Sequence, residues 1–347
     1  MVERWFGHPG RLGNPVDAHA VLAVGLDDSD CCLEHALATG HGLGHRPTLC
    51  DAAHGSRGRR TVSDGDFAST IRVVLRRLPR IHLLTFGGGS DRYRAAAHRV
   101  GKQAKASGMF ASINVVDDPS LRRDHPEFVA AHADVLRPGV RGFGYWLWKP
   151  TLVAHALRDD DFLLYVDGGC ILNLSREEPR RRLIEYTELA AGSGGLFMQM
   201  RLPEWQWSKR DTVDRLALAD ADRASGQLVA GMFLLRGSAA AGDLVRTWHA
   251  IAVEDGYHYL DDSPSHQPEH DGFVEHRHDQ AILSGLAKTA GFSAIPDETY
   301  HAPDWATTGA DLPVWATRHH WRYSTYGTRR ERMLFRLDIR RQRWRDR

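Results

Sequence analysis

The sequence is poor in cysteine and lysine, has no long hydrophobic run and carries almost no net charge. Four cysteines in 347 residues are too few for a disulfide scaffold, and Cys31 and Cys32 are adjacent, which strains any bridge between them. No apolar stretch approaches the roughly 20 residues that cross a bilayer, and the first residues lack the apolar core of a secretory signal. A formal net charge of +1 gives no whole-chain reason to expect nucleic acid as a partner. The composition therefore predicts a soluble, cytoplasmic globular protein.

The pattern of polar and apolar residues changes near residue 79. Residues 1–78 mix polar residues with short apolar pieces, which predicts a weakly structured N-terminal extension. Apolar strands then alternate with helical patterns, which predicts an α/β domain whose mainly parallel sheet is flanked by helices. We expect strands at 81–86, 113–116, 162–166, 196–200 and 228–235. We expect helices at 91–108, 127–136, 148–157, 176–191, 211–218, 239–253 and 279–290. The polar segment 255–276 predicts a long surface loop.

The apolar strand 162–166 ends abruptly at Asp167, which two glycines and Cys170 follow. Ligands of open α/β sheets bind beyond the carboxyl ends of strands, where a carboxylate can reach a ribose, a sugar or a metal ion. An ordinary Asp-Gly turn after a core strand is the alternative. One carboxylate alone does not hold a divalent cation tightly, because Mg²⁺ usually combines one or two carboxylates with phosphate oxygens and water.

Two other strands carry glycines at places that ligands favour. The first strand runs into Gly87 and Gly88, a turn that could bring backbone N–H groups to a nucleotide, although it is neither a P-loop nor a dinucleotide fingerprint. Gly231 lies inside the strand 228–235, where glycine often marks the close approach of a ligand or another backbone. A flexible turn and an ordinary bulge are the respective alternatives.

Five of the 45 basic side chains are lysines, and Lys149 opens an apolar helix directly after a cluster of aromatic residues. Aromatic residues at this density are typical of a core. A lysine at the start of a helix adds positive charge to an end that is already positive, which is unfavourable unless an anion lies there. The pattern predicts a phosphate near Lys149. Lys209, after another strand, is a second candidate for such a role.

His276 and His278 precede Asp279 at the start of another apolar helix. In an extended chain this spacing places both imidazoles on one face, as a metal site requires. Asp279 is interpreted either as a helix cap or as a general base aimed into a cleft, with the histidines as phosphate or metal contacts.

The order of these motifs is more specific than any one of them. The segments are YWLWKP (145–150), YVDGGC with Asn173 (165–173), EWQWSKRD (204–211), QLVAGMFLLR (227–236) and HRHDQAILSGL (276–286). Together they resemble a family of nucleotide-sugar glycosyltransferases of the GT-A class, over about 220 residues from Ile81. In that family an Asp-x-Gly-Cys turn stands in place of the usual DxD.

The resemblance implies a GT-A, Rossmann-type fold in one catalytic domain, residues 79–305, and a hexosyltransferase that takes a UDP- or GDP-sugar. It implies Mn²⁺ or Mg²⁺ at the diphosphate, although Gly169 replaces the second acid and leaves metal dependence open. The implied catalytic residues are Asp167 and Asp279. The expected donor-binding residues are Thr85, Phe86, Gly87, Gly88, Lys149, Asp167, Gly168, Lys209 and Gly231. The expected acceptor- or sugar-binding residues are Glu204, Gln227, His278 and Gln280, and the metal ligands are Asp167 and His276.

The expected acceptor is a glycan or lipid-linked hydroxyl in surface glycan or polysaccharide synthesis. A sugar nucleotidyltransferase and a non-catalytic nucleotide-sugar binding module are the alternatives. Within the C-terminal segment 306–347, residues 328–347 carry nine arginines against three acids, with Met333, Leu334, Leu337 and Trp344 roughly on one helical face. This pattern predicts a basic amphipathic helix that contacts an anionic membrane at its inner face, or a solvated helix.

Overall fold

A computed structural model of the chain describes residues 79–299, 305–318, 330, 333–334 and 336–337. All of them belong to the second of the two units into which the chain divides, Val73–Arg347. The predicted extension 1–78 and most of the predicted basic helix 328–347 lie outside the described residues, so both stay predictions. Within the described ranges, no helix has the length and apolar character that crossing a membrane requires.

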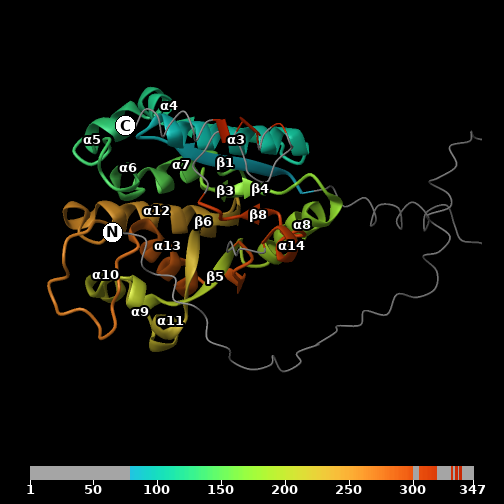
Figure 1. Cartoon of the computed structure of the whole chain (residues 1–347). Helices are drawn as coiled ribbons and strands as arrows, with labels where there is room; N and C mark the ends of the chain where they lie inside the picture. The colour runs from blue at the N-terminus through green and yellow to red at the C-terminus, as the bar shows by residue number, and fades with distance from the viewer. Residues whose placement is uncertain (1–78, 300–304, 319–329, 331–332, 335, 338–347) are drawn as a thin grey trace, which may run out of the picture. The chain divides into compact units, whose positions relative to one another are not determined.

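Strands and helices alternate along the described chain (Figure 1). The strands are β1 (Ile81–Gly87), β2 (Ser112–Asp117), β3 (Phe162–Val166), β4 (Ile171–Leu172), β5 (Gly195–Pro203), β6 (Gly226–Arg236), β7 (Ser293–Pro296) and β8 (Val314–Trp315). The longer helices are α3 (Asp91–Ser107), α7 (Trp148–Ala156), α8 (Glu177–Ala191), α12 (Ala239–Val253) and α13 (His278–Thr289). The shorter ones are α4 (Asp118–Asp124), α5 (Pro126–Ala131), α6 (Gly142–Tyr145), α9 (Glu204–Trp207), α10 (Arg210–Arg215), α11 (Asp220–Ala224), η2 (Glu254–Tyr257) and α14 (Trp305–Thr308).

The larger sheet of the described residues has six strands in the order β2-β1-β3-β6-β5-β7. β1 pairs in parallel with β2 and β3, and β5 pairs in parallel with β7. Among these six strands β6 alone runs the other way, antiparallel to both of its neighbours. The predicted α/β class with a mainly parallel sheet is therefore confirmed. β4 and β8 form a separate two-stranded ribbon.

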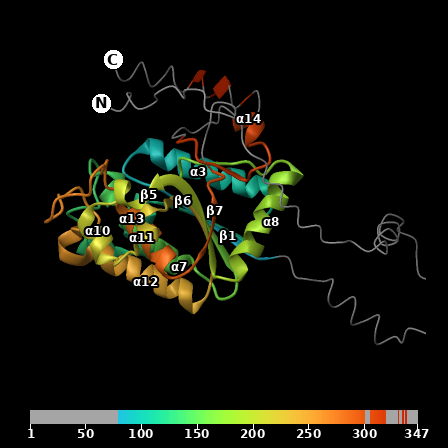
Figure 2. The ribbon, with the colours of Figure 1, turned by 90° about the horizontal axis from the view of Figure 1, so that it is seen from below.

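Helices cover both faces of this sheet, which explains the uninterrupted apolar sequence of β3. Leu163 and Tyr165 point into a core shared with α7, α12 and α13, whereas Leu164 and Val166 point into a core shared with α3 and α8. Figure 2 shows α3 and α8 on one side of the strands and α7 and α12 on the other. A strand covered on both faces has a nearly continuous apolar sequence, and the first charged side chain follows where β3 ends.

β6 bulges beside the end of β3. Phe233 pairs with Phe197, and the next pair joins Leu228 to Gln199. Between these two pairs β6 advances by five positions, whereas β5 advances by two. Such a bulge removes residues from the regular ladder and redirects their backbone groups. The residues removed here include Gly231, whose carbonyl accepts a hydrogen bond from the Asp167 N–H at 2.8 Å.

Candidate functional site

The turn after β3 is held by hydrogen bonds to its backbone groups. The Cys170 N–H donates to the Asp167 carbonyl at 2.9 Å. Arg99 of α3, which is buried, donates to the carbonyls of Gly168 at 2.9 Å and Cys170 at 2.6 Å. A Cβ on Gly168 would lie 3.1 Å from the Phe86 carbonyl oxygen, so the glycine lets the turn pack against the end of β1. The buried guanidinium of Arg99 therefore fixes the turn by binding two of its carbonyls.

Asp167 is the predicted site residue that projects from this turn. Its Oδ1 accepts a hydrogen bond from the Tyr165 hydroxyl at 2.6 Å and lies 3.7 Å from Lys149 Nζ. A Cβ on Gly231 would lie 3.0 Å from Oδ2, so glycine at this position leaves room for the carboxylate. The Asp167 side chain stays 37% exposed. Burial, with Asp167 beside it, raises the pKa of Tyr165 well above its usual value, which keeps the hydroxyl a neutral donor.

A buried ion pair lies next to Asp167. Lys149 of α7 and Asp279 of α13 approach to 2.5 Å, and Lys149 Nζ also donates to the Ala230 carbonyl in the β6 bulge at 3.1 Å. Their side chains are 2% and 6% exposed. Burial raises the pKa of Asp279 to about 6, partly offset by Lys149. Burial opposes the charge on Lys149, but the carboxylates of Asp167 and Asp279 outweigh it and raise the pKa of that ammonium.

The segment before α7 has an unusual backbone. Residues 142–146 all adopt positive φ, including Phe143 at 55°, Tyr145 at 52° and Trp146 at 62°. Aromatic side chains rarely occupy this region, and such strain clusters at functional sites. The Tyr145 and Trp146 rings lie 5.1 and 5.6 Å from the ring of His278, which itself has φ of 47°. The strained turn therefore packs against the start of α13. Glycines at 142 and 144 were the only local signal of it.

The predicted donor turn at the end of β1 is buried from Thr85 to Gly88. The Phe86 ring stacks on Trp148 at 3.8 Å between centroids, which places Trp148 in the core. Gly88 lies beneath the same ring, because a Cβ there would approach it to 2.5 Å. Thr85 Oγ1 has no hydrogen-bond partner among the described residues.

Three of the expected acceptor residues form a chain of hydrogen bonds inside the protein. Glu204 Oε1 lies 2.9 Å from Lys288 Nζ, and Glu204 Oε2 accepts from Gln227 Nε2 at 3.0 Å. Gln227 Oε1 accepts from Gln280 Nε2 at 2.6 Å, and Gln280 Oε1 accepts from the Ala230 N–H at 3.1 Å. Glu204 and Gln227 have no exposed surface in this conformation. The chain of hydrogen bonds ends at the bulge that also receives Lys149.

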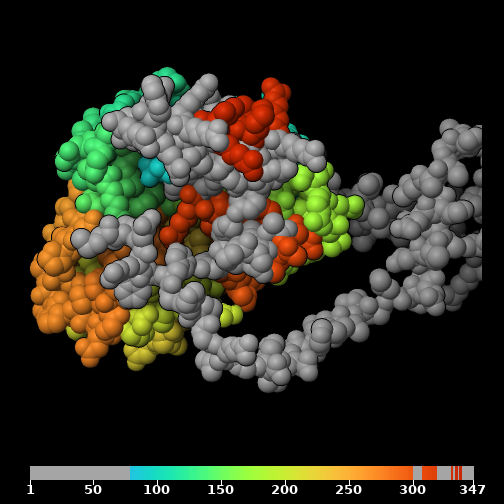
Figure 3. All heavy atoms as spheres, viewed as in Figure 1, coloured from blue at the N-terminus to red at the C-terminus, as the bar shows by residue number. Residues whose placement is uncertain are grey.

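Lys209 contacts the loop 258–277, which contains neither helix nor strand. The loop was predicted at 255–276, but residues 255–257 belong to the 3-10 helix η2. Lys209 is buried, and its Nζ lies 3.4 Å from Asp261 Oδ1, 3.1 Å from the Ser263 carbonyl and 3.2 Å from the Ser263 hydroxyl. Between these two residues, Asp262 Oδ1 lies 3.6 Å from a guanidinium nitrogen of Arg141. In the space-filling view the loop and α12, in orange, adjoin the green surface that includes this arginine's segment (Figure 3).

The two histidines before Asp279 point to different partners. His276 Nδ1 accepts from the Lys209 N–H at 3.2 Å, and its Nε2 lies 3.1 Å from the Tyr259 carbonyl. His278 Nδ1 lies 2.8 Å from the Leu260 carbonyl. Burial lowers the pKa of His276 well below its usual value, so this ring is neutral. Both ring nitrogens of His276 are thus engaged with protein atoms.

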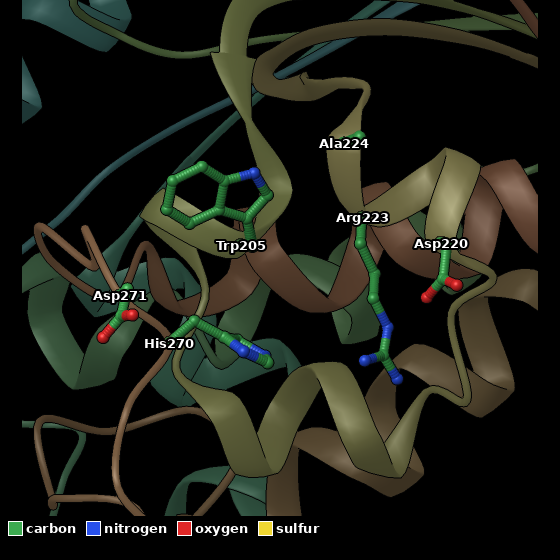
Figure 4. Close-up of a pocket in the computed structure, with 6 residues that line it drawn as sticks. All are labelled: Trp205, Asp220, Arg223, Ala224, His270 and Asp271. Carbon is green, nitrogen blue, oxygen red and sulfur yellow. The ribbon is translucent and has the colours of Figure 1, made fainter.

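The described surface also contains a pocket of about 340 Å³ that none of the sequence-predicted residues lines. Its walls are Trp205, Asp220, Arg223, Ala224, His270 and Asp271. Figure 4 shows Trp205 and His270 on one side, with Asp220 and Arg223 of α11 on the other.

No family model matches this sequence, and none of the curated proteins matches it. Some solved structures are distantly similar. Mouse xyloside xylosyltransferase 1, in its apo form, is 12% identical with a TM-score of 0.37, over 68% of this chain and 97% of that chain. A glycosyltransferase involved in the glycosylation of the major capsid of PBCV-1 is 10% identical with a TM-score of 0.36, over 68% and 92%. The galactosyltransferase LgtC, in complex with donor and acceptor sugar analogues, is 15% identical with a TM-score of 0.38, over 66% and 78%.

Proposed function

We propose that this chain is a glycosyltransferase that moves a sugar from a nucleotide-diphosphate donor to a hydroxyl acceptor. The observation that carries the proposal is the setting of Asp167. It is a partly exposed carboxylate at the carboxyl end of β3, fixed by Tyr165 and the Arg99-bound turn, with room made for it by Gly231. This is the edge of an open α/β sheet at which nucleotides bind. The order of motifs in the sequence supports the same function.

A divalent cation fits this edge only as a site with one protein carboxylate. Gly169 contributes no side chain, and Asp279 is engaged by Lys149. Asp167 Oδ2 could hold Mn²⁺ or Mg²⁺ if phosphate oxygens of the donor and water completed the shell, which is the usual pattern for Mg²⁺. When bound, such a cation would offset the negative charge of the leaving diphosphate. Without it, Asp167 would accept a hydrogen bond from a ribose hydroxyl.

Lys149 and Asp279 have a supporting role in this proposal. Lys149 is too deeply buried to contact a diphosphate in this conformation, and its charge instead orients the carboxylates of Asp167 and Asp279. The raised pKa of Asp279, about 6, suits a general base for an acceptor hydroxyl, whereas its ion pair and burial favour positioning. A retaining enzyme would need no such base.

Four other predicted residues also have positioning roles in this proposal. We propose that Glu204, Gln227 and Gln280 position the β6 bulge, and that Lys209 holds the loop 258–277 beside the acceptor side of the site. A UDP- or GDP-sugar donor, a glycan or lipid-linked acceptor, a cytoplasmic location and membrane contact through residues 328–347 remain proposals from the sequence.

The test is nucleotide release from a panel of nucleotide sugars, with Mn²⁺, with Mg²⁺ and without added metal. We expect release with at least one donor, and a loss of about 100-fold or more in Asp167→Asn, because the variant lacks the carboxylate that would hold the cation, and losing one such charge-stabilising group typically costs that much. Asp160→Asn is the matched control, since Asp160 lies just before the other end of β3 and is 82% exposed. Nucleotide binding without release would instead indicate a binding module. Pyrophosphate release from a nucleoside triphosphate and a sugar phosphate would indicate a nucleotidyltransferase.

A further inference from the structure

Outside the proposed donor site, one carboxylate contacts two histidines of the loop 258–277. Asp211 Oδ2, on α10, lies 2.7 Å from His258 Nε2 and 2.7 Å from His266 Nδ1, and it accepts from the His266 backbone N–H at 2.7 Å. The two imidazole rings lie 4.4 Å apart between centroids. The side chains of Asp211 and His258 are 12% and 10% exposed, whereas that of His266 is 70% exposed. The cluster is therefore built on a buried base and opens to solvent on one side.

The chemistry of these donors is selective. One carboxylate oxygen and two imidazole nitrogens lie within 4.8 Å of one another. Imidazole ligands suit Zn²⁺ and its neighbours in the first transition row, whereas Mg²⁺ and Ca²⁺ prefer shells made of oxygen. Zinc holds such atoms at about 2.0–2.2 Å, which separates them by roughly 3.3 Å in a tetrahedron. The present separations of 2.7 Å need only a small outward movement to reach that spacing.

The ring of His258 is also held on its other side by the protein. The other ring nitrogen of His258, Nδ1, lies 3.1 Å from the Ser263 hydroxyl, which also receives Lys209 Nζ at 3.2 Å. Metal-binding histidines typically use their second nitrogen in this way, which fixes the tautomer and the ring orientation. The partly buried His258 is thus oriented independently of any ion.

We propose that Asp211, His258 and His266 bind a transition-metal dication such as Zn²⁺, with water in the open position. The ion would fasten the loop 258–277 to α10, in addition to Lys209. Because this loop leads directly into α13 and Asp279, the ion would stabilise the chain that frames one side of the proposed donor site.

The test uses the full chain without a polyhistidine tag, stripped with a chelator and desalted. Zn²⁺ affinity is measured by competition with a chromophoric chelator, and Co²⁺ is used as a spectroscopic probe of the ligands. We expect one tight site per chain above the background of the other histidines. His266→Ala should weaken Zn²⁺ binding by at least tenfold, and Asp211→Asn should remove the visible Co²⁺ bands. Millimolar Mg²⁺ should not compete.

His266→Ala is the decisive variant, because a side chain that is 70% exposed can be removed without unfolding the protein. His270→Ala is the matched control, since His270 belongs to the same loop but not to the cluster. Zn²⁺ should raise the thermal midpoint of the parent chain and of His270→Ala, and it should leave that of His266→Ala unchanged. Equal affinity and equal stabilisation in the parent chain and His266→Ala would overturn the proposal. Competition by Mg²⁺ would overturn the metal class. None of these measurements depends on sugar transfer.

Discussion

Replacing Lys149 by methionine removes the cation from the buried ion pair while keeping an unbranched side chain of similar length. In the parent protein Lys149 Nζ lies 2.5 Å from Asp279 Oδ2 and 3.1 Å from the Ala230 carbonyl oxygen. The variant leaves the Asp279 carboxylate 6% exposed without its cation. Removing one partner of a buried pair typically costs about 3–5 kcal/mol, because the remaining charge is uncompensated. That is a large part of the roughly 5–15 kcal/mol by which domains are stable.

The loss of stability should depend on pH in a defined direction. The pKa of Asp279 is already raised to about 6 by burial, and removing Lys149 raises it further. For a carboxyl with a raised folded-state pKa, the linked stability is present at low pH and is lost as the pH rises through that pKa. Protonation also removes the uncompensated charge of the variant. The difference between variant and parent should therefore be larger at pH 8 than at pH 5.

Urea unfolding at both pH values measures these differences. The double variant Lys149→Met/Asp279→Leu, which removes both charges, should be more stable at pH 8 than Lys149→Met alone. Arg215→Met is the comparison for a surface pair, since Arg215 and Glu254 are 41% and 38% exposed and such pairs contribute at most about 1 kcal/mol. The reasoning would be refuted if the free energy of unfolding of Lys149→Met at pH 8 lay within about 1 kcal/mol of the parent value.

Two further substitutions test the surroundings of Asp167. Gly231→Ala places a Cβ 3.0 Å from Asp167 Oδ2, so we expect nucleotide release to fall by about tenfold or more through displacement of the carboxylate. Gly192→Ala meets no atom within 4 Å and should leave release unchanged. Equal release in the two variants would contradict the assigned contact. Arg99→Met removes the donor to the Gly168 and Cys170 carbonyls and should cost about 2–3 kcal/mol. Amide hydrogen exchange at residues 167–170 should then quicken, and unchanged protection would argue against the role of Arg99.

Much of the fold could be predicted because its signals are local. β3 is an apolar run that ends in a carboxylate, and its five residues are all buried, as the pattern predicts for a strand covered on both faces. The alternation of strands and helices predicted a mainly parallel sheet, which the pairing confirms. The reversed direction of β6 was not predicted, because an apolar strand reads the same whichever way it runs. The ribbon β4–β8 was also missed, since each strand has only two residues.

The residues proposed for the site came from the sequence, whereas their contacts are seen only in the structure. A lysine at a helix start was expected to meet a phosphate, and Lys149 meets the carboxylate of Asp279, 130 residues away. That carboxylate supplies an anion for the Lys149 ammonium. The spacing of His276 and His278 was compatible with both rings on one face, as phosphate or metal contacts, yet each ring hydrogen-bonds to a different backbone carbonyl. Local spacing does not determine where a loop places its rings.

The sequence by itself determined the α/β order of elements, the carboxylate at the end of β3 and the glycine-containing segments around it. These depend on periodicity and on turn chemistry, which act over a few residues. Only the tertiary structure decided that Asp279 neutralises Lys149, that the β6 bulge turns the Ala230 carbonyl toward the same ammonium, and that His258 and His266 meet at Asp211. Such contacts join residues far apart in the chain, and they form because buried charges and polar groups need partners wherever the fold brings them together.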